Sequence, residues 1–264
     1  MLIIAERINT SRKSIAEAVT ENDTDFIVNE IKIQEEAGAD YIDINAGTFA
    51  AQEIEKLSWL IEIVQKNTDL PICLDSADPK TIHTVLPMIH HPPMINSINL
   101  DRKRYDALMP MIIERQCKVI GLCQAAGKAG HSISEKIDIA GQLIQELTQS
   151  GLFLENIYID PLVFSLATDT TSGLNTLNAI REIMNKYKGV HTICGLTNVS
   201  YGLPERKLMN SAFLISAILM GLDAAIMDPT NKPLFSLMKA ALLLNDKDPY
   251  AQNYIKAFRQ GRFS

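Results

Sequence analysis

The stretch YIDIN at residues 41–45 contains the pattern that decides the fold, because a short apolar run ends there on a polar side chain. The stretch ICLD at residues 72–75 repeats this pattern, after a segment with helical periodicity at 51–66. A short and nearly continuous apolar run is typical of a parallel strand that is buried on both faces. The two stretches therefore predict neighbouring parallel strands with polar groups at their carboxyl ends.

Runs of this kind recur along the whole chain, and nearly all of them finish on a polar residue. They are Leu2–Glu6, Tyr41–Asn45, Ile72–Asp75, Met94–Asn99, Val119–Cys123, Ile157–Asp160, Thr192–Asn198 and Ala224–Asp228. Between them, apolar residues fall on one helical stripe in segments such as 51–66, 134–149 and 174–187. Eight buried strands that alternate with helices predict an α/β fold, the (β/α)8 or TIM barrel, whose functional groups lie at the carboxyl ends of the strands.

Length and composition fit one barrel. The chain has 264 residues and 47% hydrophobic content, and a barrel of about 250 residues would use nearly all of it, so we expect a single domain over residues 1–264. The net charge of −6 argues against a nucleic-acid partner. The absence of a long apolar stretch or a basic leader predicts a cytoplasmic protein without a membrane segment. Four cysteines without a CxxC pair are expected to be buried free thiols.

Two local patterns mark helix starts, and one marks a subunit contact. Asp78 followed by Pro79 reads as an N-cap and first helical residue, and Ser134 is a candidate N-cap for the 134–149 helix. Segment 207–222 is apolar on more than one face, which in an outer helix indicates burial against another subunit. We therefore expect an oligomer, most simply a two-fold homodimer.

The polar residues at the predicted strand ends are carboxylates and carboxamides rather than cations. They are Glu6, Asn9, Asp43, Asn45, Asp75, Asn96, Asn99, Gln124, Asp160, Asn198 and Asp228. A carboxylate can accept two parallel N–H bonds from an amino-pyrimidinone edge, and Asn can donate and accept at once. The set therefore suits a neutral, nitrogen-rich heterocycle. Its carboxylates could also hold a divalent metal, because hard cations prefer oxygen ligands.

Three other chemistries that occur on this fold are disfavoured. A Schiff-base aldolase needs an inward lysine, and none of the eight runs contains one. Catalytic zinc would need His or Cys ligands at the mouth, yet the histidines lie away from the strand ends. A phosphate site would need glycine-rich turns after the last two strands, where only Gly202 occurs.

Six motifs, in order along the chain, resemble one family. They are Glu6-Arg7-Ile8-Asn9, Asp43-Ile44-Asn45-Ala46-Gly47, Leu74-Asp75-Ser76, Asn96-Ser97-Ile98-Asn99, Asp160-Pro161-Leu162 and residues 195–204, GLTNVSYGLP. This set is similar to that of the pterin-binding methyltransferases that act between methyltetrahydrofolate and a corrinoid protein. The likeness runs from the first strand to about residue 230. It implies a TIM barrel, a homodimer, and a tetrahydrofolate or methyltetrahydrofolate substrate at the barrel mouth.

The same resemblance implies roles for individual residues. Asn198 matches the catalytic Asn near the methyl-bearing N5 of the folate. The substrate-binding residues are expected to be Asp75, Asn96, Asp160, Arg206, Glu6 and Asp43. Tyr201 and Thr197 depart from the residues common in the family, which leaves the subgroup open.

The resemblance also implies a partner, because the chain shows no DxHxxG corrinoid-binding signature. The cobalamin is then carried by a separate corrinoid protein, and no metal is expected on this chain. Two other enzymes stay open as alternatives: a pterin barrel of the dihydropteroate synthase type, and a divalent-metal lyase that uses Asp43, Asp75 and Asp160. A noncatalytic folate-binding subunit is a third reading.

Overall fold

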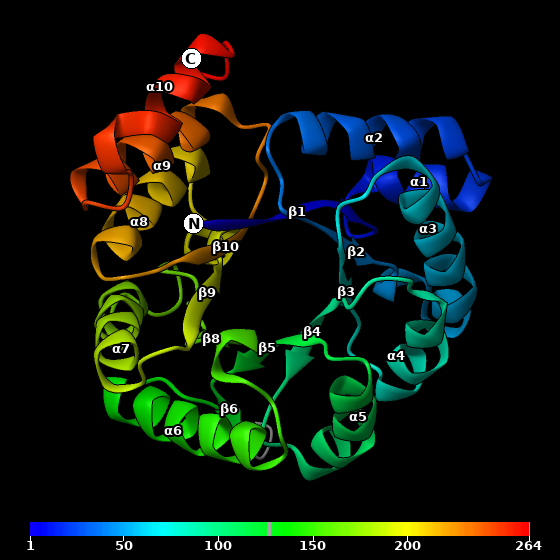
Figure 1. Ribbon diagram of the computed structural model, residues 1–264, viewed down its shortest axis with the longest axis horizontal. Helices are drawn as coiled ribbons and strands as arrows, with labels where there is room; N and C mark the ends of the chain where they lie inside the picture. The colour runs from blue at the N-terminus through cyan, green and yellow to red at the C-terminus, as the bar shows by residue number, and fades with distance from the viewer. Residues whose placement is uncertain (126–127, 264) are drawn as a thin grey trace.

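A computed structural model of the protein describes residues 1–125 and 128–263. Eight parallel strands form a closed barrel, with helices as an outer ring (Figure 1). Around the barrel the strands follow the order β1-β2-β3-β4-β5-β8-β9-β10, and β10 pairs with β1 to close it. The predicted TIM barrel is therefore confirmed. The expected single-domain range 1–264 includes residues 126, 127 and 264, which lie outside the described residues.

The strand bounds agree with the eight apolar runs, apart from some ends. The barrel strands are β1 (Leu2–Asn9), β2 (Tyr41–Asn45), β3 (Ile72–Asp75), β4 (Met94–Ile98), β5 (Lys118–Leu122), β8 (Ile157–Asp160), β9 (His191–Gly195) and β10 (Ala224–Met227). Two ends differ by three residues: β1 continues beyond Glu6 to Asn9, and β9 ends at Gly195 although the apolar run was expected to continue to Asn198. A short hairpin of β6 (Gln124–Ala125) and β7 (Lys128–Ala129) follows β5.

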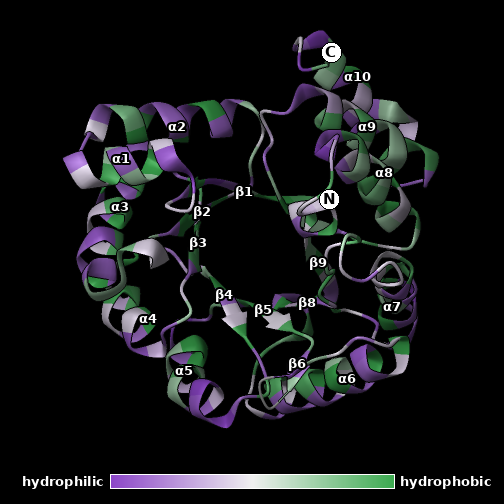
Figure 2. Ribbon diagram, turned by 180° about the vertical axis from the view of Figure 1, so that it is seen from behind, coloured by the Kyte–Doolittle hydropathy of each residue, from purple (hydrophilic) through white to green (hydrophobic). Residues whose placement is uncertain are grey.

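Helices cover the outside of the barrel. The α-helices are α1 (Lys13–Glu21), α2 (Thr24–Glu36), α3 (Glu53–Asn67), α4 (Pro79–Val85), α5 (Arg102–Glu114), α6 (Ile133–Gln149), α7 (Ser172–Lys186), α8 (Arg206–Leu219), α9 (Lys232–Leu244) and α10 (Gln252–Arg259). Short 3-10 helices are η1 (Gly47–Gln52), η2 (Leu86–Met88), η3 (Leu154–Asn156), η4 (Leu196–Ser200) and η5 (Pro249–Ala251). Hydrophobic and hydrophilic residues alternate along the outer helices (Figure 2), as expected where one stripe of each is buried.

The period of two along each strand separates an inner from an outer core. On β2, Ile42 and Ile44 face outward and join the cluster that contains Leu57 and Leu60 of α3. Tyr41 faces inward and belongs to a smaller cluster that fills the barrel. The members of that inner cluster are Ile4, Tyr41, Cys73, Met94, Ile120, Tyr158, Ile193 and Ala224. One residue comes from each of the eight strands, so the barrel is closed below its mouth by a packed layer.

Local predictions have mixed outcomes. Asp78 caps α4 by accepting from the Lys80 N–H, and Pro79 is the first helical residue, as predicted. The N-cap of α6 is Ser132, not Ser134, because Ser132 and Glu135 form a reciprocal capping box one half-turn earlier. All four cysteines are buried, as predicted.

Candidate active site at the barrel mouth

A layer of polar residues lies directly above the inner apolar layer. Each of these residues follows an inner-cluster residue by two positions, so the strand alternation points its side chain into the barrel as well. The residues placed in this way are Glu6, Asp43, Asp75, Asn96 and Asp160. Five of the seven residues expected in the site therefore lie together at the carboxyl ends of the strands.

Asp75 is held by its neighbour on β2. The Asn45 side-chain amide donates to Asp75 Oδ2 at 3.0 Å, across the pair in which these two residues are in register. Burial raises the pKa of Asp75 to about 6, although the Asn45 hydrogen bond and the charge of Arg104 both lower it. Asp75 is thus a carboxyl group whose charge state changes close to neutral pH.

Asp43 lies deeper and is less well paired. Its side chain is buried, and its Oδ1 atom has no hydrogen-bond partner among the described residues. Burial, followed by the charge of Asp75, raises the pKa of Asp43 well above its ordinary value, while Cys73 and Asn96 lower it. A buried polar atom without a partner is costly, so this carboxyl group is a point of instability within the mouth.

Asp160, at the end of β8, accepts from the backbone of the loop that follows it. The Leu162 N–H donates to Asp160 Oδ1 at 2.8 Å. Burial raises the pKa of Asp160 to about 6, while the N–H groups of Leu162 and Gly195 and the ammonium of Lys136 lower it. The carboxyl group is therefore fixed in direction, and its charge is supported by its own loop, by the end of β9 and by α6.

Asn198 and Arg206 lie at the mouth beside Glu6. All three line a cavity of about 540 Å³, together with Asn9, Ser11, Arg12, Thr197 and Asn210. Gly195 leaves room for the Asn198 amide, because a Cβ atom at Gly195 would lie 3.1 Å from Asn198 Nδ2. Burial, followed by the charge of Asp228, raises the pKa of Glu6 to about 7. The cavity thus combines an amide, a cation and a carboxyl group that titrates near neutrality.

Arg206 also supports the turn that carries Asn198. Its Nη2 atom donates to the Thr197 carbonyl at 2.9 Å, and its Nε atom donates to Ser200 Oγ at 3.1 Å. Both partners belong to η4, the 3-10 turn that follows β9. The guanidinium therefore contacts the Thr197 carbonyl before Asn198 and the Ser200 hydroxyl after it, as well as lining the cavity.

Asp228 stands apart from the carboxylate layer. Its Oδ2 atom pairs with Arg7 Nη1 at 3.0 Å, and its Oδ1 atom accepts from Thr230. Arg7 in turn is bound by Glu30 of α2. In residues 1–125 and 128–263, no group of three or more His, Cys, Asp or Glu side chains has a geometry that could hold a metal ion. Asp228, one of the strand-end carboxylates that could hold a divalent metal, is thus committed to an arginine.

Sequence reasoning did not identify Lys136 as part of this region. The apolar stripe that the sequence predicts for residues 134–149 consists of Ile137, Ala140, Ile144 and Leu147. In the structure, α6 also buries Lys136, together with Ala140 and Leu143. A lysine one residue before an apolar stripe normally reads as solvated. The signal was its spacing of four from Ala140, which places both residues on one face of the helix.

The fold and the polar residues at the barrel mouth together define the class of this protein. A closed parallel barrel with a converging polar layer at its carboxyl-terminal end is a TIM-barrel protein with a small-molecule site. The pterin-binding enzyme family matches residues 5–228 of the chain. The chain is also 34% identical to the methylcorrinoid:tetrahydrofolate methyltransferase of Eubacterium limosum, over 99% of this chain and 97% of that one. The chain therefore belongs to the pterin-binding enzyme family, within the group of corrinoid-dependent folate methyltransferases.

Two further similarities are more limited. The methionine synthase of Mycobacterium tuberculosis is 29% identical over 86% of this chain, which corresponds to 20% of that longer enzyme. Among solved structures, the dihydropteroate synthase of Xanthomonas albilineans with 4-aminobenzoic acid superposes with a TM-score of 0.69 and 20% identity. That match covers 95% of this chain and 92% of the other, and at this identity it shows the shared fold alone.

Proposed function

We propose that this protein transfers a methyl group between N5 of tetrahydrofolate and the cobalt of a corrinoid protein. The observation that carries the proposal is the polar layer of the mouth, which combines carboxyl groups with Asn96 and shares Glu6 with the cavity that Asn198 lines. This arrangement suits the hydrogen-bonding edge of a pterin ring. The similar protein of Eubacterium limosum is named a methylcorrinoid:tetrahydrofolate methyltransferase, which agrees with this reaction.

In this proposal, Asp75, Asn96 and Asp160 bind the pterin edge. A carboxylate can accept the paired N–H groups of an amino-pyrimidinone, and the Asn96 amide can both donate and accept. Asp43, expected as a further substrate-binding residue, pairs in register with Cys73, two residues before Asp75, and interacts with Asn96, so it would support these two residues from below. Burial raises the pKa values of both Asp75 and Asp160 to about 6, which is still below 7, so both carboxylates are mainly ionised above pH 7.

Methyl transfer from N5 requires that a proton is supplied to this nitrogen, and the reverse reaction requires that it is removed. An amine is a poor leaving group unless it gains a proton, so N5 must be protonated or strongly hydrogen-bonded as the methyl group departs. Asn198 cannot titrate, but its amide oxygen can accept from protonated N5. Glu6 lines the same cavity, and its pKa of about 7 suits exchange of this proton in either direction. The corrinoid of the partner supplies the cobalt centre when that protein docks.

The proposal includes a homodimer, a corrinoid protein as the second partner, and a cytoplasmic location, with the chain acting as one domain. Support for the dimer comes from α8, on which Leu208 and Leu219 are exposed to 72% and 52%. Large apolar side chains on an outer helix favour burial against another subunit. Within residues 1–125 and 128–263, no helix is long and apolar enough to cross a membrane.

The test combines folate binding with a transfer assay. Methyltetrahydrofolate binding should be the same with and without EDTA, and methyl transfer to free cob(I)alamin should proceed in EDTA. Asp160→Ala should weaken folate binding by about 1 to 3 kcal/mol, because it leaves ligand donors without an acceptor. Unchanged affinity in that variant contradicts the site. Activity restored only by added magnesium or zinc supports the metal lyase, and binding without transfer supports the dihydropteroate synthase type or a noncatalytic subunit.

A further inference from the structure

Lys136 is a fully buried lysine in the first turn of α6. Its ammonium donates to the Leu162 carbonyl at 2.6 Å and to the neighbouring Pro161 carbonyl, and it lies 5.2 Å from the centre of the Phe164 ring. All three partners belong to the loop after β8, directly beyond Asp160. A buried ammonium is costly unless it is paired, so this position calls for a physical reason.

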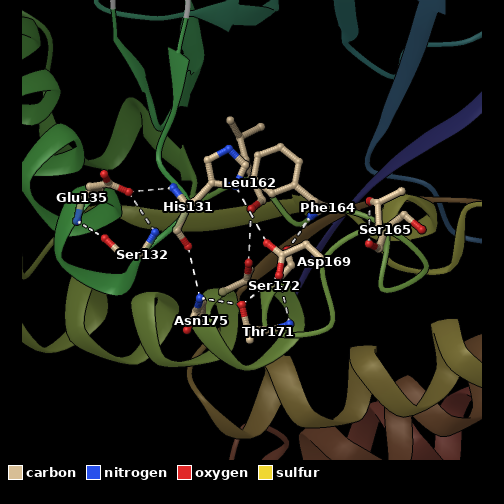
Figure 3. Close-up of polar contacts among 12 residues, drawn as sticks. His131, Ser132, Glu135, Leu162, Phe164, Ser165, Asp169, Thr171, Ser172 and Asn175 are labelled. Carbon is tan, nitrogen blue, oxygen red and sulfur yellow. Dashed lines mark hydrogen bonds and ion pairs between the residues drawn. The ribbon is translucent and has the colours of Figure 1, made fainter.

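The helix turn that carries Lys136 is fixed in place. Ser132 and Glu135 form a capping box at the start of α6, and the His131 N–H also donates to Glu135 (Figure 3). The Cys123 thiol at the end of β5 donates to the Lys136 carbonyl at 3.4 Å. The start of α6 is therefore tied to the barrel, and the ammonium approaches the β8 loop from a defined direction.

The loop that Lys136 contacts is in turn anchored to α7. The Phe164 N–H donates to Ser172 Oγ at 2.8 Å (Figure 3). Thr176 Oγ1 donates to the Leu162 carbonyl at 3.2 Å. Leu162 itself has a φ of 57°, in the left-handed region that a leucine rarely adopts. Such a residue keeps this conformation only where its surroundings hold it.

The N–H of the same residue, Leu162, donates to Asp160 Oδ1 at 2.8 Å, and the φ of Leu162 sets the direction of its carbonyl relative to that N–H. Two hydrogen bonds, joined through the backbone of Leu162, therefore connect the Lys136 ammonium to the Asp160 carboxylate. We infer that Lys136 is a positioning residue, which holds the Asp160 carboxylate ionised and directed into the mouth for ligand binding. The inference rests on the proposed folate site and deepens it.

The charged and titratable groups around Lys136 and Asp160 are consistent with an ionised Asp160 beside a charged Lys136. Lys136 lowers the pKa of Asp160 against the effect of burial, while burial lowers the pKa of Lys136 and Asp160 raises it. Cys123 on the β5 side and Cys194 on β9 also face the pair, and burial raises the pKa of both thiols, so both stay neutral. Asp169 faces Lys136 from the β8 loop and favours its charged form. Loss of the ammonium therefore leaves Asp160 protonated to a higher pH.

The experiment is calorimetric binding of 5-methyltetrahydrofolate between pH 5.5 and 9, on the full chain. In Lys136→Met the pH midpoint of binding should rise by about one unit, the usual scale for losing a paired cation next to a carboxylate. Lys136→Arg, which keeps the charge, should retain a midpoint close to that of the wild type. In an Asp160→Asn background, Lys136→Met should shift the midpoint no further, since the group that responds is gone.

Lys56→Met is the matched control. Lys56 is also a buried lysine, on α3, with its ammonium 3.5 Å from Asn22 Oδ1 and 3.4 Å from Glu55 Oε1. Removing it should leave the pH midpoint of binding unchanged, whatever its effect on the melting temperature. The control thus separates a loss of stability from a change at Asp160.

The outcomes separate this inference from the proposed function. An unchanged midpoint in folded Lys136→Met, or an equal loss of affinity at every pH, overturns the role of Lys136. If Lys136→Met does not fold, the pH midpoint of binding is measured for Lys136→Gln instead, and an unchanged midpoint again overturns the role of Lys136. A wild-type protein that binds no 5-methyltetrahydrofolate at any pH contradicts the proposed function itself, whereas normal wild-type binding with an unmoved midpoint contradicts only the inference.

Discussion

Asn198 shares its cavity with Glu6 and Arg206, and its own side chain is an uncharged amide that does not titrate. Its amide can therefore contribute to methyl transfer only by binding the protonated form of N5 better than the neutral form. An interaction that is stronger in the transition state lowers the barrier without an equal gain in ground-state binding. The role of Asn198 thus depends on how much more strongly its amide binds protonated N5 than neutral N5.

Replacing Asn198 with Ala should reduce the rate of methyl transfer by roughly 100- to 1000-fold, the usual scale for removing one preorganised hydrogen-bonding group. The dissociation constant of methyltetrahydrofolate should change much less. Single-turnover transfer to cob(I)alamin and calorimetric binding, measured on the same preparations, give the two quantities. A variant whose whole loss lies in binding makes Asn198 a residue that only positions the folate.

The strand-end residues were predictable because they follow a simple rule. A buried run that ends on a carboxylate places that group at the mouth of a parallel barrel, and the period of two then selects Asp43, Asp75 and Asp160. Lys136 was not predictable in the same way. One residue along a helix turns the side chain by about 100°, so a stripe assigned to Ile137 places its neighbour outside the core.

At the scale of elements, α6 matters because its first turn carries Lys136. Ser132 caps that turn by accepting from the Glu135 N–H at 3.2 Å, and Glu135 Oε2 accepts from the Ser132 N–H at 2.9 Å. Ser134, which the sequence analysis favoured as the cap, contacts only the Asp138 side chain among the described residues, at 3.4 Å. The two serines are therefore a matched pair, two residues apart, with different roles.

Ser132→Ala should lower the free energy of unfolding by about 1 kcal/mol, the usual cost of losing an N-cap. Ser134→Ala should change it by less than about 0.5 kcal/mol, as is typical of surface substitutions. Urea unfolding followed by circular dichroism gives both values from one experiment. Equal effects of the two substitutions would mean that the capping box contributes nothing to stability.

The existence of each barrel strand was easier to predict than its last residue. β9 ends at Gly195, but the sequence beyond it contains Leu196 and Val199, which are buried in η4. Hydrophobicity alone does not distinguish a buried strand from a buried 3-10 turn. The informative residue is Gly195, whose missing side chain gives Asn198 its space. The β6–β7 hairpin carries no comparable signal, because each of its strands has two residues.

At the scale of the whole molecule, the closed barrel was predictable because eight buried runs with helices between them have few other arrangements. The apolar runs do not reveal the protonation states of the carboxyl groups at the barrel mouth. Four carboxyl groups of the mouth have raised pKa values, and burial is the largest cause for each of them: Glu6, Asp43, Asp75 and Asp160. Because the folded state disfavours the ionised form of these groups, its free energy of unfolding is lower at pH values where they are ionised.

Asp43 gives the clearest test of this cost. Its folded-state pKa is raised above its ordinary value, so the folded protein holds that proton more tightly than the unfolded chain does. The free energy of unfolding therefore falls as the pH rises above the pKa of the unfolded chain. Asp43→Asn removes this titration. The variant should match the wild type near pH 4 and exceed its free energy of unfolding at pH 8 by about 1 to 3 kcal/mol.

The control is Asp169→Asn, because that carboxylate has the opposite environment. Asp169 accepts from Thr171, which lowers the pKa of Asp169, so its charged form favours the folded state. Its replacement should give no gain in stability at pH 8. Melting temperatures of both variants between pH 4 and pH 8 are the measurement. A gain for Asp43→Asn that grows with pH, together with slower methyl transfer, would show that the mouth keeps a destabilising carboxyl group for function. Equal stability at pH 8 would mean instead that the buried Asp43 charge is fully compensated by its neighbours.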